Sequence, residues 1–135
     1  SIEEYNHKLV SIKFGKVQNQ GKSKYLNNVK NQILDYTLGR LKKFKVDIFL
    51  EGTISQKKIW YELIKIPYGK TVSYGEIAKK LKTSPRFVGN VCGQNNHLLV
   101  IPCHRIIRFD GSLGGFSGLG GIKLKKRLIS LEKNE

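Results

Sequence analysis

The strongest chemical signal in this sequence is a thiol directly before an imidazole, at Cys103 and His104. The thiolate is the form of cysteine that attacks carbon, and a neighbouring base or cation lowers the pKa of a thiol. His104 and Arg105 are residue types that can do this, which favours Cys103 as a nucleophile. The alternative is an unreactive cysteine beside an unrelated side chain, because free cysteine also packs as a small apolar residue.

An apolar run at residues 98–101 leads through Pro102 into the cysteine. Such a run predicts a buried extended segment, and proline ends it because its ring removes a backbone donor. We therefore expect Cys103 at the end of a rigid element.

Four stretches carry a resemblance to a known family: IPYGKTVSYGEIA at 66–78, RFVG at 86–89, IPCHR at 101–105 and GGFSG at 114–118. In this order they resemble the O6-alkylguanine-DNA alkyltransferases, also called methylated-DNA–protein-cysteine methyltransferases. The resemblance implies direct repair of duplex DNA, in which an O6-alkylated guanine is flipped out and the cysteine takes its alkyl group irreversibly. Such an acceptor is a single-turnover transferase that needs no soluble cofactor.

The charge balance points to a polyanionic partner. The 135 residues include 25 lysines and arginines against 10 acids, which gives a formal charge of +15 and a pI near 9.9. This favours nucleic acid, with an acidic membrane surface or simple solubility as the alternatives. Together with the resemblance, it predicts double-stranded DNA containing O6-alkylguanine as the partner of a monomeric protein, with no obligatory protein partner.

No pattern in the sequence predicts a membrane or metal site. No stretch approaches the roughly 18 consecutive apolar residues of a membrane span, and no charged-then-apolar leader opens the chain. We expect a soluble cytoplasmic protein, in a reducing compartment where Cys92 and Cys103 remain thiols. His7, His97 and His104 lack zinc-ligand spacing. Some members of the resembled family hold a structural zinc, but the cysteines for it are missing here, so no metal is expected.

Periodicity predicts an α+β fold in two domains. Residues 8–17 alternate loosely, as a strand does, and five apolar residues after them recur at helical spacing. These five are Val29, Ile33, Tyr36, Leu41 and Phe44. Residues 47–50 form another short extended piece, and Gly52 marks the boundary. We expect a small, shortened α/β domain at 1–52 and a mainly helical, winged-helix-like domain at 53–135.

The second domain is expected to contain a helix-turn-helix. An amphipathic helix begins near Ser55 and is ended by a proline and a glycine. Ser73 and Glu76 then form the capping-box pattern of a second helix, and Ser84 followed by Pro85 opens a third. Two short helices separated by a tight turn are a DNA-docking unit when they are basic and exposed.

The resemblance assigns binding roles to several residues. Arg86 matches the arginine that fills the space left by the flipped nucleotide, although alone it is typical of a surface arginine. Tyr74 matches the tyrosine that donates toward the guanine ring, and from the residues alone it is equally a core residue. Ser117 matches the serine whose backbone contacts the guanine oxygen. Phe116 lies in the apolar wall where relatives often carry tyrosine, and Ser55 is a further predicted DNA contact.

Activation of the cysteine in the resembled family runs through the adjacent histidine, a water and a glutamate near the C-terminus. The matching residues are His104 and Glu132, the latter at the end of a helix predicted at 122–131. Glu135 is a second candidate for the glutamate. Asn95 matches the asparagine that orders the active-site turn, and could otherwise be an ordinary helix-end residue.

Two other functions remain open at this point. One is a non-catalytic alkyltransferase-like protein that only binds the lesion, which the presence of Cys103 disfavours because that group lacks the acceptor cysteine. The other is a basic transcriptional regulator that uses the helix-turn-helix, with Cys103 as a sensor. We interpret Cys92, which is expected to face the same pocket, as a small core residue and not as a second acceptor.

Overall fold

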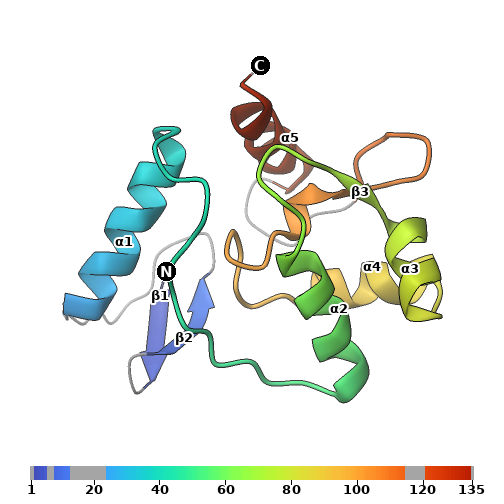
Figure 1. Ribbon diagram of the computed structural model, residues 1–135, viewed down its shortest axis with the longest axis horizontal. Helices are drawn as coiled ribbons and strands as arrows, with labels where there is room; N and C mark the ends of the chain where they lie inside the picture. Colours follow the sequence, from blue (N-terminus) through green and yellow to red (C-terminus); the bar gives the residue numbers. More distant parts are fainter. Residues whose placement is uncertain (1, 6–7, 13–23, 115–120, 135) are drawn as a thin grey trace.

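The computed structural model describes residues 2–5, 8–12, 24–114 and 121–134. These ranges contain α-helices, short strands and one 3-10 turn (Figure 1). The elements are β1 (Ile2–Tyr5), β2 (Lys8–Ile12), α1 (Lys24–Thr37), α2 (Ile54–Ile64), β3 (Val72–Ser73), α3 (Tyr74–Leu81), α4 (Pro85–Gly93), η1 (Cys103–Arg105), β4 (Ile106–Ile107) and α5 (Gly121–Lys133). Helices together with small, separate sheets confirm the predicted α+β class.

β1 and β2 form an antiparallel hairpin near the N-terminus. β2 is the start of the strand predicted at 8–17, and the part of that prediction beyond residue 12 lies outside the described residues. The edge of β2 bridges through Leu9 to Ile48 and through Ile12 to His97. The extended piece expected before Gly52 is therefore a single bridge, and the hairpin is tied to two later segments of the chain.

α1 confirms the helical spacing around Val29 and Tyr36, which are both completely buried. The prediction is wrong beyond the helix, because Gly39 adopts a φ of +74°, a left-handed conformation that glycine accepts readily and that commonly ends helices. Leu41 and Phe44 are therefore not helical. They still pack in the apolar cluster that contains Tyr36, so the same face is buried by a different backbone.

α2, α3 and α4 begin at caps that are encoded locally. Ser73 and Glu76 form the predicted capping box of α3, and Ser84 caps α4 with proline at its first helical position. α2 begins one residue before Ser55, at a capping box made by Thr53. Only three residues separate α3 from α4, as the predicted helix-turn-helix requires.

The apolar run at 98–101 is buried except at Val100, which is half-buried, but it is not extended as predicted. Leu99 has a φ of +73°, and the Ile101 amide donates to the His97 carbonyl at 2.9 Å, so the chain turns here. The side chain of Asn95 holds the turn from within: its oxygen accepts from the His97 amide, and its nitrogen donates to the Ile101 carbonyl at 2.9 Å. Because apolar side chains are buried equally well in a turn, burial alone did not determine the backbone here.

A two-residue parallel pairing brings distant segments together. Val72 pairs with Ile106, and Ser73 pairs with Ile107. β3 runs directly into α3, and η1 runs directly into β4. The turn that carries the cysteine therefore lies beside the first turn of α3, while α5 packs on η1 (Figure 1).

The main buried cluster contains residues from both sides of position 52. Leu9, Ile12 and Val29 pack in it together with Trp60 and Val88. The predicted boundary thus separates elements that share a core, and the division into two domains stays a prediction. No helix in the described ranges is long and apolar enough to cross a bilayer.

Candidate active site

A cavity of about 640 Å³ opens beside the turn that carries the cysteine. Its walls come from the first turn of α3, from α4, from η1 and from the turn after β4. The lining residues are Tyr74, Gly75, Pro85, Arg86, Gly89, Cys92, Gly93, Cys103, Arg108, Phe109 and Gly114. The wall is tight at Gly114, where a Cβ would lie 2.8 Å from Cε2 of Tyr74. The volume is in the range that accepts a small organic ligand.

Cys103 lines this cavity, although its side chain is only 3% exposed. The amide nitrogen of Asn95 donates to its sulfur at 3.2 Å. Burial raises the pKa of the Cys103 thiol, and the bond from Asn95 and the charge of Lys125 only partly oppose this. The net effect is the opposite of the acidic thiol expected from the residues beside Cys103 in the sequence, and the guanidinium of Arg105 binds Glu132 instead. The resting thiol is protonated.

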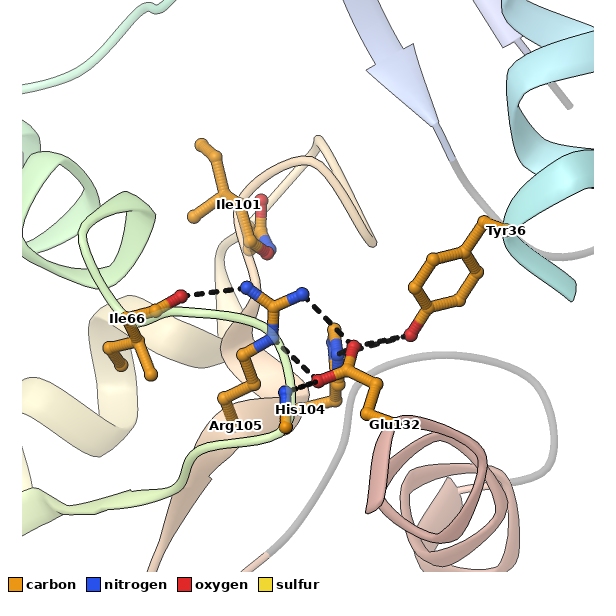
Figure 2. Close-up of polar contacts among 8 residues, drawn as sticks. Tyr36, Ile66, Ile101, His104, Arg105 and Glu132 are labelled. Atoms are coloured by element: carbon orange, nitrogen blue, oxygen red, sulfur yellow. Dashed lines mark hydrogen bonds and ion pairs between the residues drawn. The ribbon is translucent and has the colours of Figure 1, made fainter. Parts of the chain in front are cut away.

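His104 and Glu132 meet in a buried hydrogen-bond network (Figure 2). Nε2 of His104 lies 2.6 Å from Oε2 of Glu132. Arg105 donates to the same carboxylate from Nε at 2.7 Å and from Nη2 at 3.0 Å. The hydroxyl of Tyr36 donates to Oε2 at 2.5 Å, and the amide of Gly69 donates to Oε1 at 3.3 Å. The carboxylate of Glu132 is thus surrounded by donors.

These contacts determine the protonation states behind the cysteine. Burial raises the pKa of Glu132, but the hydrogen bonds from His104 and Arg105 outweigh it and hold the pKa at about 2. Burial lowers the pKa of His104, which keeps the imidazole neutral. Because Nε2 faces an ionised carboxylate, it carries the proton, and Nδ1 keeps a free lone pair. Within the described residues Nδ1 has no hydrogen-bond partner.

A lysine lies close enough to Cys103 for its charge to act on the thiol. Lys125 is completely buried on α5, with Nζ 3.4 Å from the Tyr74 hydroxyl and 5.5 Å from the centre of its ring. Burial lowers the pKa of Lys125 and raises that of Tyr74 to about 12. Burial also raises the pKa of Cys92 to about 12, in keeping with its interpretation as a small core residue at the cavity wall.

The other predicted site residues are distributed as follows. Arg86 lies exposed in the first turn of α4, at the cavity. Ser55 is exposed in the first turn of α2 and does not line the cavity. Ser117, Phe116 and Glu135 lie outside the described residues. The structure therefore brings together the cysteine, the histidine, Glu132, Asn95 and Tyr74, with Arg86 on the same cavity.

Two buried polar residues of this site were not recognised as site residues in the sequence. Lys125 could have been found, because it shares the buried face of α5 with Leu128 and Glu132 at a spacing of three and seven residues. Tyr36 gave no such signal, since it lies on the apolar face of a helix and its partner is 96 residues away. Across the described ranges, no three histidine, cysteine or acidic side chains are grouped to hold a metal ion, and both cysteines are free thiols.

Comparison with known proteins assigns the family. Residues 55–134 match the family model described as the DNA binding domain of 6-O-methylguanine DNA methyltransferase. The chain belongs to the 6-O-methylguanine DNA methyltransferase family. The family membership predicted from the four motifs is thereby confirmed.

Relatives within the 6-O-methylguanine DNA methyltransferase family agree with this assignment. A methylated-DNA–protein-cysteine methyltransferase of Mycobacterium tuberculosis is 42% identical over 106 residues, which is 77% of this chain and 63% of that protein. One of Methanosarcina mazei is 38% identical over 112 residues, 82% of this chain and 70% of that protein. The crystal structure of Mycobacterium tuberculosis OGT in complex with DNA superposes with a TM-score of 0.86 at 32% identity, covering 98% of this chain and 85% of that one. The match thus spans less than two thirds of the mycobacterial relative's sequence.

Proposed function

We propose that this protein repairs DNA by transferring the alkyl group of an O6-alkylguanine in duplex DNA onto Cys103. A bond forms between the cysteine sulfur and the alkyl carbon, the bond from that carbon to O6 breaks, and the thiol proton ends on the released guanine. S-alkylcysteine remains and is not regenerated, so each molecule acts once. The observation that carries the proposal is a buried thiol that lines a base-sized cavity and has a neutral imidazole adjacent to it in the chain.

Activation of the thiol is the first chemical step. Because burial raises the pKa of Cys103, the proton must be removed as the sulfur attacks. We assign this role to His104, whose Nδ1 accepts the proton through a water while Nε2–H remains bonded to Glu132. The imidazolium that forms is stabilised by the ionised carboxylate, as in other nucleophile–base–carboxylate arrangements. Asn95 holds the sulfur in place.

Stabilisation of the leaving guanine is the second requirement. Negative charge develops on the base as the alkyl carbon departs, and a donor aimed at that charge lowers the barrier. Tyr74 lines the cavity and supplies a hydroxyl, which its raised pKa keeps protonated. The ammonium group of Lys125, which donates to the oxygen of that hydroxyl at 3.4 Å, makes the hydroxyl a better donor. Where the sequence alone left Tyr74 equally a core residue, this contact favours the donor role.

Engagement of DNA is assigned to the helix-turn-helix. α4 presents the exposed Arg86 at the mouth of the cavity, where a guanidinium can fill the gap left by an extruded nucleotide. The net charge of +15 supplies the non-specific attraction to phosphates. The names of the relatives, which specify methylated DNA, support the same substrate. Ser117, Phe116 and Ser55 remain proposed contacts to the guanine, the alkyl group and the DNA, and we propose a monomer acting in the cytoplasm without a soluble cofactor.

The test is the intact mass of the protein after mixing with duplex DNA that carries one O6-methylguanine. We expect a gain of one methylene equivalent per chain, localised to Cys103 by peptide mapping and absent in Cys103→Ser. Tight, lesion-dependent binding with no mass gain would replace the proposal with a non-catalytic binder. Binding to one DNA sequence irrespective of the lesion would favour a transcriptional regulator.

A further inference from the structure

We propose that Tyr36 is a positioning residue for alkyl transfer: its hydroxyl fixes the Glu132 carboxylate and thereby holds His104 with Nδ1 available to the thiol. This inference rests on the function proposed above. Tyr36 lies on α1, in a part of the chain that precedes the matched family model at 55–134. The reactivity of the cysteine would therefore depend on the N-terminal segment as well as on the segment that carries the motifs.

The contacts form a closed triangle of polar atoms. The Tyr36 hydroxyl lies 2.5 Å from Oε2 of Glu132 and 3.4 Å from Nε2 of His104, and the same Oε2 is 2.6 Å from Nε2 (Figure 2). All three side chains are buried, and those of Tyr36 and His104 are not exposed at all. This oxygen also accepts from Nη2 of Arg105, and a buried carboxylate oxygen that accepts three hydrogen bonds from two elements, α1 and η1, has little freedom to rotate.

Hydrogen-bond direction follows from the protonation states. Burial raises the pKa of Tyr36, so the phenol is neutral and owns a single proton. That proton goes to the ionised carboxylate, because the distance to Oε2 is much shorter than the distance to Nε2, and the imidazole Nε2–H donates to the same oxygen. If the imidazole carried its proton on Nδ1 instead, a bare Nε2 would face the carboxylate lone pairs. The triangle therefore specifies the tautomer that can act as a base.

The charge around His104 gives Tyr36 a second effect. Glu132 and Lys125 face the imidazole from α5, Arg105 from η1, and Tyr36 from α1. The carboxylate favours the protonated imidazole, whereas the two cations and burial oppose it. By donating to Oε2, Tyr36 withdraws negative charge from the atom that pulls on the imidazole proton. Loss of the hydroxyl should therefore make His104 easier to protonate.

Packing keeps the phenol ring in this position. The rings of Phe44 and Tyr68 lie 5.4 Å and 6.1 Å from that of Tyr36, and the imidazole of His104 meets it edge-on at 6.5 Å. Phe44 comes from the segment after α1, and Tyr68 comes from the connection between α2 and β3. Replacing tyrosine by phenylalanine preserves this ring packing, so the effect of the hydroxyl can be tested separately.

The experiment compares Tyr36→Phe with Tyr68→Phe, a matched loss of one hydroxyl in the same aromatic cluster that removes no contact to His104. Single-turnover methyl transfer is followed from pH 5 to 9 on duplex DNA with O6-methylguanine. For Tyr36→Phe we expect the acid limb of the rate to move up by about 0.5 to 1 pH unit, which slows transfer by about three- to tenfold on that limb, near pH 6. Duplex affinity should be unchanged, and Tyr68→Phe should match the wild type. An unmoved acid limb, or equal slowing by both variants, would overturn the proposal.

A second measurement needs no activity and no lesion. Nitrogen-15 NMR of labelled histidine, with the His104 signals identified by their loss in His104→Gln, reports the tautomer and the titration of the free protein. We expect the Nε2–H tautomer in the wild type and a raised pKa in Tyr36→Phe. An Nδ1–H tautomer in the wild type would contradict the proposal even if Tyr36→Phe did not fold. A wild type with the expected tautomer but no methyl transfer would refute the proposed function alone.

Discussion

The most demanding prediction concerns Glu132→Gln. The carboxylate accepts five hydrogen bonds, two from Arg105 and one each from His104, Tyr36 and the amide of Gly69. Glutamine has the same shape but no charge, and it replaces one acceptor oxygen with an NH2 group that faces donors. The variant therefore leaves the buried guanidinium of Arg105 without its counter-charge.

The magnitude follows from the pKa of Glu132, which lies at about 2 in the folded protein against 4.5 for the free side chain. A depressed pKa in the folded state contributes stability above the unfolded value, and this contribution is lost as the pH falls through the folded value. The difference corresponds to about 3 kcal/mol at pH 7, comparable to the roughly 3–5 kcal/mol expected for breaking a buried ion pair. By pH 3.5 the wild type should have lost about 1 kcal/mol of it.

The assay is urea unfolding at pH 7 and at pH 3.5 for the wild type, Glu132→Gln and Glu51→Gln, the last being an exposed glutamate. We expect Glu132→Gln to lower the free energy of unfolding by about 3 kcal/mol at pH 7. The difference in this free energy between the wild type and the variant, the stability gap, should be smaller at pH 3.5. Glu51→Gln should lie close to the wild type at both values. A loss below about 1 kcal/mol at pH 7, or a gap that does not change with pH, would refute the reasoning.

Two further variants test residues on either side of Tyr74, namely Lys125 and Gly114. Lys125→Met removes the ammonium beside Tyr74 and the sulfur, and we expect methyl transfer to slow by about 10- to 100-fold in a quenched single-turnover assay. Its duplex affinity should stay within about twofold, since a completely buried lysine contacts no phosphate, and a large loss of affinity would argue against this role. Gly114→Ala places a Cβ 2.8 Å from Cε2 of Tyr74 and must displace that ring. In a titration, Gly114→Ala should bind lesion-containing duplex more weakly than the wild type does, while its affinity for undamaged duplex stays unchanged. If the variant binds the lesion as tightly as the wild type, the ring of Tyr74 can move aside without cost.

Local features of the fold were predicted well because the residues that determine them lie within one helical turn. The capping box of Ser73 and Glu76 and the start of α4 at Ser84 depend only on a hydroxyl and on the amides two or three residues later. Predictions failed where two different backbone conformations can bury the same side chains. The run at 98–101 turns instead of extending, and Leu41 and Phe44 pack without a helix.

The site residues likewise divide into those that a sequence pattern predicted and those that only the folded structure revealed. Cys103, His104 and Tyr74 were predicted because they belong to the four motifs, and Asn95 and Glu132 were predicted from the family resemblance alone. The structure brings all five together. Tyr36 and Lys125 reach the same site from other elements and belong to none of the four motifs. Their polar groups are recognisable only once the partner atoms are known.

The sequence by itself determined the adjacency of a thiol and an imidazole at Cys103 and His104, the helix caps and the strong positive charge, because each depends on composition or on neighbours along the chain. Only the tertiary structure decided how that pair is protonated. Adjacency to a histidine and an arginine suggested an acidic thiol, whereas burial raises the pKa of Cys103, and the arginine is committed to Glu132. A pKa depends on desolvation and on charges within a few ångströms, and for these residues both are supplied by α1, α4 and α5, which meet the cysteine turn only in the folded chain.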